Sequence, residues 1–542
     1  MKFIKKSLIF YFLILGLTLV ACQSNDSEEV NKEINNEENK AEDQDKDQEK
    51  NNDTARKELR IAYNAQPPTL DTYISVAGAT RQVASQIFES LVTLDSNYVI
   101  QPMLAESYEE SEDGKTITFH LRQGIKFHNG EEMKADDVVA SMERWFSRSS
   151  VGKANFSDAT IDAEDEYTVV INLSEYSFLT LYFLANPTQL AGITTKENAE
   201  SADEALGIDE MIGTGPFKFE EWKQDQYIHL SKFDEYSSRS EQPDGFAGGK
   251  EVLIDDLYFE FVSDSSTRVA GMLSGEYDIA TTIPFDNVDQ LEKDSNVEIQ
   301  SGEVSFTAMI FNKKAGVFSD QKIRQAVNAA LDMEEILMAA FGSEDYYELQ
   351  HGLMIEDQIE WHSEKGKENY NINDTEKAKQ LLQEAGYDGE EITVMTSRDY
   401  PEMYDASVVA QQQLNELGMN IKLEIYDWPT VIELREDPSA YDAFFTVVAT
   451  EPFPNAFYFL DSANEYAGWT DSPEIDDLLN KITQSRTQEE AAEIFGELQE
   501  EFWDYLPLIR FGDSKAIRAH RNNVQNVRGF MGLQLWNVDK EE

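Results

Sequence analysis

The sequence predicts an α/β fold, because strand-like segments that alternate every two residues recur between segments with the three-to-four-residue spacing of helices. The strand patterns occupy residues 59–63, 116–121, 168–173, 254–262, 392–395, 421–426 and 444–448. About 485 residues follow a polar N-terminal stretch, and 41% of the chain is apolar, enough for more than one hydrophobic core. No repeat period indicates a solenoid.

The clearest run of local signals lies between residues 104 and 145. In order, it contains a turn at Asp113-Gly114, a strand that alternates Ile117, Phe119 and Leu121, a second turn at Asn129-Gly130, and a helix that begins through Asp136. By itself this run predicts a strand-turn-helix unit of a soluble domain.

A second unit is predicted later in the chain. Thr375 is a candidate N-cap for a helix that ends at Gly386, a residue suited to the left-handed terminator. The helix pattern 403–417 also ends at a glycine, Gly418, and the alternating strand 421–425 follows it. With the strand before it, this helix predicts a βαβ unit in a parallel sheet.

Several strings of this sequence are more specific than their periodicity. They are Leu104-Ala105-Glu106-Ser107, Phe127-His128-Asn129-Gly130, Ala135-Asp136-Asp137-Val138, Pro68-Thr69-Leu70-Asp71, Gly213-Thr214-Gly215-Pro216-Phe217 and Gly468-Trp469-Thr470-Asp471. Together and in family order along the chain, they resemble the family 5 extracytoplasmic solute-binding proteins, the peptide- and nickel-binding receptors of ABC importers. The resemblance covers nearly all of the chain after the N-terminal segment.

The resemblance implies a periplasmic-binding-protein-like fold with two lobes, a cleft between them and an extra subdomain. By that analogy lobe I comprises residues 58–80, 190–305 and 466–542, the extra subdomain II comprises 81–189, and lobe III comprises 306–465. The chain would cross between the lobes near 304–307 and 464–468. Hinge closure around the solute would then create the form that a membrane permease recognises.

The N-terminus predicts export and a lipid anchor. Three lysines precede the short apolar run 8–17, and Leu19-Val20-Ala21-Cys22 resembles a lipobox, so residues 1–22 are expected to be a lipoprotein signal peptide. An ordinary signal peptide with an incidental cysteine is the alternative. Residues 23–57 are acidic and polar, which predicts a disordered tether. The protein is therefore expected at the outer face of the cell membrane, attached through lipid on Cys22.

The composition excludes several function classes. The net charge of −59 leaves no basic patch for nucleic acid. This charge either attracts cationic cargo or serves solubility in a salty or alkaline habitat. Cys22 is the only cysteine, which excludes a disulfide framework, thiol catalysis and a Cys-ligated zinc site.

No enzyme motif is recognisable. The six histidines form no His-x-x-x-His or His-Glu-x-x-His pair, and no Gly-x-Ser-x-Gly elbow or phosphate-cradling loop is present. We therefore expect a receptor without catalytic activity, without a cofactor and without a metal site of its own, acting as a monomer.

The cargo is expected to contact both lobes. In dipeptide receptors of the family, an acidic proline-containing loop after a lobe III strand binds the ligand's amino terminus through an Asp. Here the loop includes Glu451-Pro452-Phe453-Pro454, with Phe453 where that Asp is common. Either Glu451 supplies the charge, or the cargo lacks a free amine.

Other candidates follow strand ends, where open α/β sheets bind ligands. Arg398 is suited to a carboxylate or to an ion pair with a neighbouring acid, and Tyr400 to stacking or hydrogen bonding. Trp428 is either a pocket wall or an interlobe plug. From the opposite lobe, Tyr63 and Asn64 are expected to face the cleft.

The sequence thus predicts a receptor that captures peptides and delivers them to an ABC permease with its ATPase subunits. Nickel chelates, glutathione-like thiols, opines and oligosaccharides are the alternatives. Direct nickel binding would need converging ligands, and His351 with His362 is the nearest pair in the sequence.

Overall fold

The computed structural model describes residues 56–203 and 207–541. The predicted signal peptide 1–22, its lipid attachment residue Cys22 and the predicted tether up to residue 55 lie outside the described residues. Arg56 and Lys57 were placed in the tether, but they contact the folded body. The Arg56 guanidinium pairs with Asp256 at 2.6 Å, and the Lys57 backbone N–H donates to Asp255 at 2.8 Å.

One mixed sheet joins the two lobes, in which the described residues contribute eleven strands. These are β1 (Glu58–Tyr63), β8 (Phe217–Lys223), β9 (Tyr227–Lys232), β10 (Asp256–Phe261), β11 (Ile279–Ala280), β12 (Val297–Phe311), β13 (Tyr347–Glu348), β14 (Glu391–Ser397), β15 (Asn420–Tyr426), β16 (Ala443–Ala449) and β17 (Leu508–Arg521). The order is β15-β14-β16-β12-β17-β11-β1-β10-β9-β8, and β13 also pairs with β17. Every strand that the sequence predicted within the ranges of this sheet is present.

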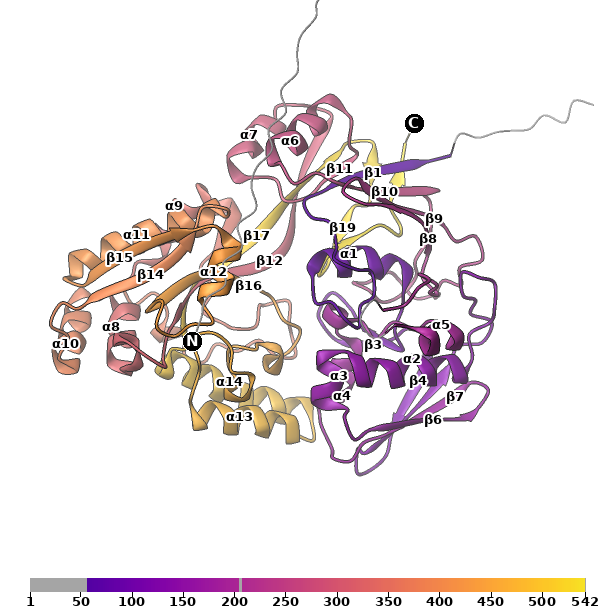
Figure 1. The fold of residues 1–542 in the computed structure, drawn as a ribbon, viewed down its shortest axis with the longest axis horizontal. Helices are drawn as coiled ribbons and strands as arrows, with labels where there is room; N and C mark the ends of the chain where they lie inside the picture. The colour runs from indigo at the N-terminus through magenta and orange to yellow at the C-terminus, as the bar shows by residue number, and fades with distance from the viewer. Residues whose placement is uncertain (1–55, 204–206, 542) are drawn as a thin grey trace, which may run out of the picture. The chain divides into compact units, whose positions relative to one another are not determined.

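The long strands β12 and β17 run from one lobe to the other (Figure 1). They pair in antiparallel fashion, and Gly302 with Glu303 together oppose Ala516, which is a β-bulge. The first crossing is therefore in β12, which contains the predicted residues 304–307. The second lies in β17 rather than near 464–468.

Lobe III contains the parallel unit β14, α11 (Pro401–Leu417) and β15, as the sequence predicted. Its other helices are α8 (Gln321–Ala330), α9 (Met333–Phe341), α10 (Thr375–Ala385), α12 (Trp428–Leu434), α13 (Pro473–Gln484) and α14 (Gln488–Tyr505). The N-cap of α10 is Asp374, whose carboxylate accepts from the Lys377 N–H, so the prediction of Thr375 was one residue late.

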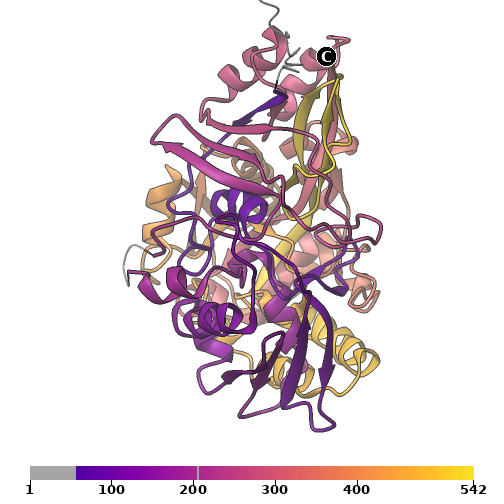
Figure 2. The same cartoon turned by 90° about the vertical axis from the view of Figure 1, so that its right-hand side faces the viewer.

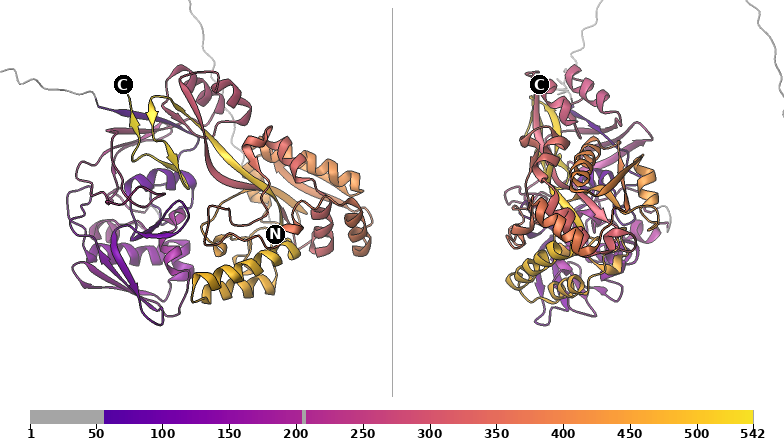
Figure 3. Two further views of the ribbon diagram at one scale, coloured as in Figure 1. Left: turned by 180° about the vertical axis from the view of Figure 1, so that it is seen from behind. Right: turned by 90° about the vertical axis from the view of Figure 1, so that its left-hand side faces the viewer.

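The boundary of lobe III lies further along the chain than the sequence indicated. Residues 466–507 were assigned to lobe I, yet α13 and α14 bury Ile475, Leu498 and Phe502 in the same core as Phe306 and Phe444. Figure 3 shows these two helices beside the lobe III elements in the view from behind. The amphipathic faces of both helices account for this placement, because they need the lobe III sheet to cover them.

Lobe I contains β1 and β8–β11 with the helices α1 (Gly78–Ile87), α6 (Ser265–Ser274) and α7 (Val288–Leu291), and the short C-terminal strands β18 (Val524–Gln525), β19 (Arg528–Gly529), β20 (Leu533–Gln534) and β21 (Asp539–Lys540). Helix α1 was assigned to the extra subdomain from residue 81. It belongs to lobe I instead, because Val83 and Ile87 pack with Leu59 and Phe217.

The extra subdomain has its own core and a four-stranded sheet, seen at the bottom of Figure 2. The strands of the subdomain are the pair β2 (Val92–Leu94) and β3 (Ile100–Pro102) and the four sheet strands β4 (Ala105–Glu110), β5 (Thr116–Leu121), β6 (Thr160–Asp165) and β7 (Thr168–Asn172). The helices of the subdomain are α2 (Ala135–Arg148), α3 (Ser150–Asn155), α4 (Thr180–Ala185) and α5 (Lys196–Ser201). The sheet order is β4-β5-β7-β6, and α2 buries Val138 and Trp145 against Phe119 and Ile171.

Short 3-10 turns complete the described elements: Pro187–Gln189, Phe285–Asn287, Val317–Ser319, Glu344–Tyr346, Lys367–Asn369, Pro454–Ala456 and Ser462–Asn464. Within the described ranges, none of the helices has the length and apolar content that a membrane span requires.

Candidate functional site: a charged cavity at the interlobe strands

A cavity of about 200 Å³ lies where β1, β12 and β17 meet the first turn of α1. Eight of its lining residues have polar or charged side chains: Tyr63, Asn64, Arg81, Gln82, Thr281, Thr282, Glu303 and Arg518. The structure therefore places the predicted residues Tyr63 and Asn64 at a cavity beside the interlobe strands. Their position follows from the end of β1.

Tyr63 is a hydrogen-bond donor at this cavity. Burial raises the pKa of its phenol to about 12, with Arg81 acting in the opposite direction and Glu303 in the same one. The phenol therefore stays protonated at any physiological pH. Edge-to-face packing on Phe259, with ring centroids 6.4 Å apart, holds the ring in place.

Arg81 brings a positive charge that is only partly satisfied. One guanidinium nitrogen donates to Thr188 at 3.3 Å, while the buried Nε has no hydrogen-bond partner within the described residues. The helix that carries Arg81 is fixed, because the Gln82 amide donates to the Leu533 carbonyl at 2.7 Å and accepts from the Leu533 N–H at 2.6 Å. Arg81 is therefore held at the cavity by a rigid element.

Glu303 and Arg518 largely compensate each other. The bulge in β12 places Glu303 so that its carboxylate lies 3.6 Å from the buried Arg518 guanidinium. Burial lowers the pKa of Arg518, and Glu303 counteracts that shift. Arg518 also donates to the Arg528 carbonyl at 3.3 Å. Of the two arginines at the cavity, Arg518 has an acid and a carbonyl as partners, so Arg81 keeps more free hydrogen-bonding capacity.

Glu451 is the acid on the lobe III side. The loop that carries it is fixed to β12, because the Thr450 hydroxyl donates to the Val304 carbonyl at 2.9 Å. The Gln358 amide donates to the Glu451 carbonyl at 2.6 Å. Among the described residues, no donor is hydrogen-bonded to the Glu451 carboxylate. Burial raises its pKa to about 8, and Arg81 is the one charge that opposes this shift.

The charge of Glu451 also acts on two tyrosines. Burial raises the pKa of Tyr98 and of Tyr458, and Glu451 contributes to both shifts. Arg81 and Glu303 also act on Tyr98. The Glu451 loop also lies next to the cavity strand, because Thr450 is hydrogen-bonded to Val304, the residue after the cavity residue Glu303.

The predicted residues Arg398, Tyr400 and Trp428 form a separate group. The exposed Arg398 guanidinium donates to the Tyr404 hydroxyl at 2.9 Å and lies over its ring at 4.6 Å. Tyr400 and Trp428 pack edge to face with centroids 5.4 Å apart. None of the three lines the charged cavity, and Arg398 is not among the charges that shift Glu451.

Phe453 does not line a binding surface in this structure. Its side chain is fully buried, and its ring lies 5.6 Å from that of Tyr182 and 5.1 Å from that of Phe183. Phe453 therefore has a packing role here, and its role as a ligand contact stays a prediction. The reason is that α4 of the extra subdomain covers it, a contact that no local pattern reveals.

His351 and His362, the pair considered for nickel, contact different groups. The ring Nε2 of His351 lies 3.1 Å from the Ser363 carbonyl, whereas that of His362 lies 3.1 Å from Glu364. In the part of the chain that the structure describes, no group of three or more His, Cys, Asp or Glu side chains is placed to hold a metal ion.

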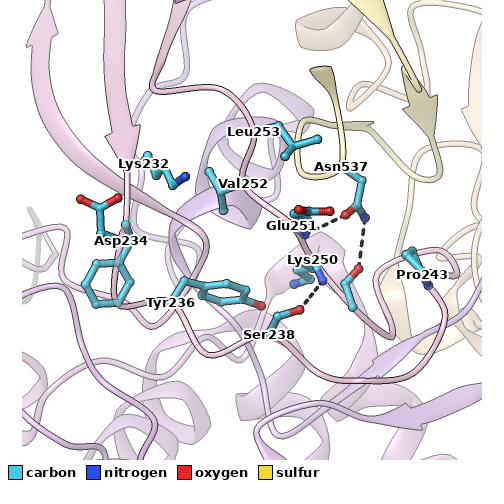
Figure 4. Close-up of a pocket in the computed structure, with 12 residues that line it drawn as sticks. Lys232, Asp234, Tyr236, Ser238, Pro243, Lys250, Glu251, Val252, Leu253 and Asn537 are labelled. Atoms are coloured by element: carbon cyan, nitrogen blue, oxygen red, sulfur yellow. Dashed lines mark hydrogen bonds between the residues drawn. The ribbon is translucent and has the colours of Figure 1, made fainter. Parts of the chain in front are cut away.

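A larger, more open hollow of about 570 Å³ lies on lobe I, away from β12 (Figure 4). One of its two lysines is already engaged, because the buried Lys250 ammonium donates to Glu89 at 2.8 Å. Asn537 closes the far side by accepting from the Glu251 N–H at 2.7 Å. With Lys250 and Asn537 engaged in this way, and with no lining residue from β12 or β17, the hollow is a weaker candidate than the charged cavity.

The comparison with known families decides the class of protein. Residues 99–471 match the model for the middle region of bacterial extracellular solute-binding proteins, family 5. The chain belongs to this family. Its members are solute receptors of ABC transporters rather than enzymes, they work outside the cytoplasm, and their fold has two lobes.

Individual relatives agree with this assignment. The chain is 29% identical to a probable peptide ABC transporter periplasmic-binding protein of Sinorhizobium fredii, over 87% of this chain and 91% of the relative. It is 24% identical to the oligopeptide-binding protein AppA of Bacillus subtilis, over 89% and 91%. The solved structure of the PBP AgaA of A. tumefaciens R10 with agropinic acid is 27% identical, covers 90% of this chain and 99% of its own, and has a TM-score of 0.71.

Sequence reasoning missed Arg81, Glu303 and Arg518. Arg81 lies one turn into a helix whose packing partner is more than 400 residues away at Leu533. Glu303 becomes a cavity residue only through pairing with the strand that carries Arg518. The available signal was the Arg at the start of α1, in the segment that follows the strand end at Tyr63.

Proposed function

We propose that this receptor captures peptides between lobe I and lobe III and delivers them to the permease of an ABC importer. The observation that carries the proposal is the half-buried Glu451 carboxyl group, which accepts no hydrogen bond among the described residues and whose pKa burial raises to about 8. Such a group is costly unless a cation meets it. The amino terminus of a peptide is a cation of suitable size, and two of the relatives are named for peptides.

Binding assays on the natively purified protein test this function. We expect mass spectrometry of the released solute to find peptides, and free peptides of two to five residues to raise the unfolding temperature of the stripped protein. Recovery of only non-peptide solutes would refute the peptide assignment. An opine is the second candidate, because AgaA is named in complex with agropinic acid.

The lipid anchor is part of the same proposal. Its support is the sequence ending in Cys22. We expect Cys22→Ser to release the protein into the medium or to leave it uncleaved, as measured by fractionation and intact mass. A correctly cleaved Cys22→Ser variant that stays membrane-attached would contradict a lipid anchor. Light scattering of the solute-loaded protein checks the proposed monomer.

A further inference from the structure

We propose that Arg81 of lobe I holds the carboxylate end of the cargo, so that a zwitterionic solute bridges Arg81 and Glu451. This inference rests on the proposed function for the cleft itself, and adds which residue recognises the anionic end and on which lobe it lies.

The free hydrogen-bonding capacity of Arg81 is the first observation. A guanidinium has five N–H donors, and binds a carboxylate through two parallel hydrogen bonds. In this structure a single weak contact, to Thr188 at 3.3 Å, engages Arg81, and its buried Nε has no partner in the described ranges. A ligand carboxylate would satisfy this nitrogen.

The neighbouring charges are already engaged. Arg518 lies 3.6 Å from Glu303 and donates to a backbone carbonyl, so it is a poorer receptor for a second anion. The Arg398 guanidinium donates to the Tyr404 hydroxyl and lies over the Tyr404 ring, and the Arg398 side chain is exposed. Water would weaken any ion pair of Arg398 with a ligand. Arg81 therefore remains as the arginine with free capacity at the cavity.

Tyr63 and Asn64 add polar groups to the site beside Arg81. Both line the cavity with Arg81, and the protonated Tyr63 phenol is a further donor. The cavity of about 200 Å³ is large enough for the end of a ligand but not for a whole oligopeptide. It is therefore suited to a carboxylate and the group next to it.

The opposite charge lies on the other lobe. The Glu451 loop reaches the strand that lines the cavity, because the Thr450 hydroxyl donates to the carbonyl of Val304, the residue after Glu303, at 2.9 Å. A zwitterion placed between Arg81 and Glu451 would contact both lobes, and would favour the closed form through its two ends. An amidated or esterified analogue would lose the lobe I half of this contact.

The test uses the full-length protein stripped of solute, and a panel of free-acid peptides of two to five residues, octopine-like amino acid conjugates, and neutral oligosaccharides. The tightest carboxylate-bearing member is then compared with its C-terminal amide or methyl ester by calorimetry. On the wild type we expect the neutral analogue to bind at least about 30-fold more weakly.

Three variants and a matched control locate the effect. Arg81→Gln should lose the preference for the free acid, whereas Arg398→Gln should keep it. Arg60→Gln is the matched control, because Arg60 is a lobe I arginine paired with Glu260 at 2.7 Å on the surface. Arg81→Lys should retain part of the preference, since it keeps the charge but not the two-pronged geometry. Unchanged unfolding temperatures of the stripped variants show that the fold is intact.

Each outcome supports or refutes the role of Arg81, the peptide function or both. If Arg81→Gln keeps the full preference, or if Arg398→Gln removes it, the role of Arg81 is refuted. If no member with a carboxylate binds the wild type, both the role and the peptide function fail. If only the amino acid conjugates bind, the peptide function fails, while the loss of preference in Arg81→Gln still supports the role of Arg81.

Discussion

The Tyr182 hydroxyl donates to Glu360 at 2.6 Å, which ties α4 of the extra subdomain to lobe III. The Tyr182 ring also lies 5.7 Å from that of Trp361, inside the lobe III core. A second tie follows nearby, where the Tyr176 hydroxyl donates to the Ser485 carbonyl at 2.6 Å. The extra subdomain is therefore tied to lobe III by side-chain hydrogen bonds.

Tyr182→Phe should weaken the contact between the extra subdomain and lobe III. The change removes a hydrogen bond to a carboxylate but keeps the ring, so we expect about tenfold lower affinity for the cargo, mainly through faster release. Stopped-flow fluorescence measures the release. Tyr227→Phe is the control, because Tyr227 donates to Glu221 at 2.7 Å on an exposed part of lobe I. Equal release rates for both variants would argue against the tie.

Phe453→Ala should destabilise the protein rather than only reduce binding. The side chain is fully buried between lobe III and the rings of Tyr182 and Phe183, so its removal leaves a cavity that costs about 3–5 kcal/mol. Denaturant unfolding of the solute-free protein measures this loss. Phe453→Leu keeps most of the volume and should retain the affinity. A normal stability with a large affinity loss in Phe453→Ala would instead support the ligand-contact role.

Arg510 and Asp513 form a buried ion pair on β17, where the chain crosses between the lobes. Arg510 also donates to the Gln350 carbonyl at 2.6 Å, and burial raises the pKa of Asp513. Arg510→Ala leaves the acid unpaired, so we expect a loss of about 3–5 kcal/mol in unfolding free energy. Lys481→Ala, which breaks an exposed pair with Asp477 at 2.7 Å, should cost less than about 1 kcal/mol. Similar losses would contradict this ranking.

The elements that sequence reasoning recovered are those with local signals. The strand β5 and the parallel unit of β14, α11 and β15 follow from turn residues, alternation and glycine terminators. The crossing in β17 could not be found in this way, since its register with β12 joins residues about 200 positions apart. No periodicity within either strand encodes that partner.

The candidate site could be predicted in part for the same reason. Strand ends pointed to Tyr63 and Asn64, which line the cavity, and to the Glu451 loop, which is hydrogen-bonded to β12 beside it. Arg398 follows an equally good strand end, but its guanidinium packs on Tyr404 six residues later. A strand end thus predicts which edge of the sheet is used, whereas long-range packing decides which side chains remain free to bind.

Glu451 should make the stability of the solute-free protein fall as the pH rises. Its pKa is about 8 in the folded state and about 4.3 in an unfolded chain, so the folded state binds the extra proton between these values. Stability is therefore lost from about pH 5 to 8. Glu451→Gln cannot ionise, and its unfolding temperature should match the wild type near pH 4 and exceed it at pH 8.5. A difference that does not change with pH would contradict the raised pKa.

Cargo binding should show the opposite slope on the acid side. Below pH 8 both Glu451 and a peptide amino terminus, with a pKa of about 8, are protonated, so forming the ion pair releases one proton. Affinity should then rise up to about tenfold for each pH unit, and fall above pH 8 as the amine loses its proton.

Calorimetry in buffers of different ionisation enthalpy measures this proton release directly. Glu451→Gln should bind without releasing the proton and show no acid slope, because its amide is neutral at every pH. Glu110→Gln is the control, since burial also raises the pKa of Glu110 but that residue lies in β4 of the extra subdomain. A wild-type affinity that is constant from pH 6 to 8 would show that the cargo's cation does not meet Glu451, and would leave the acid loop without its proposed partner.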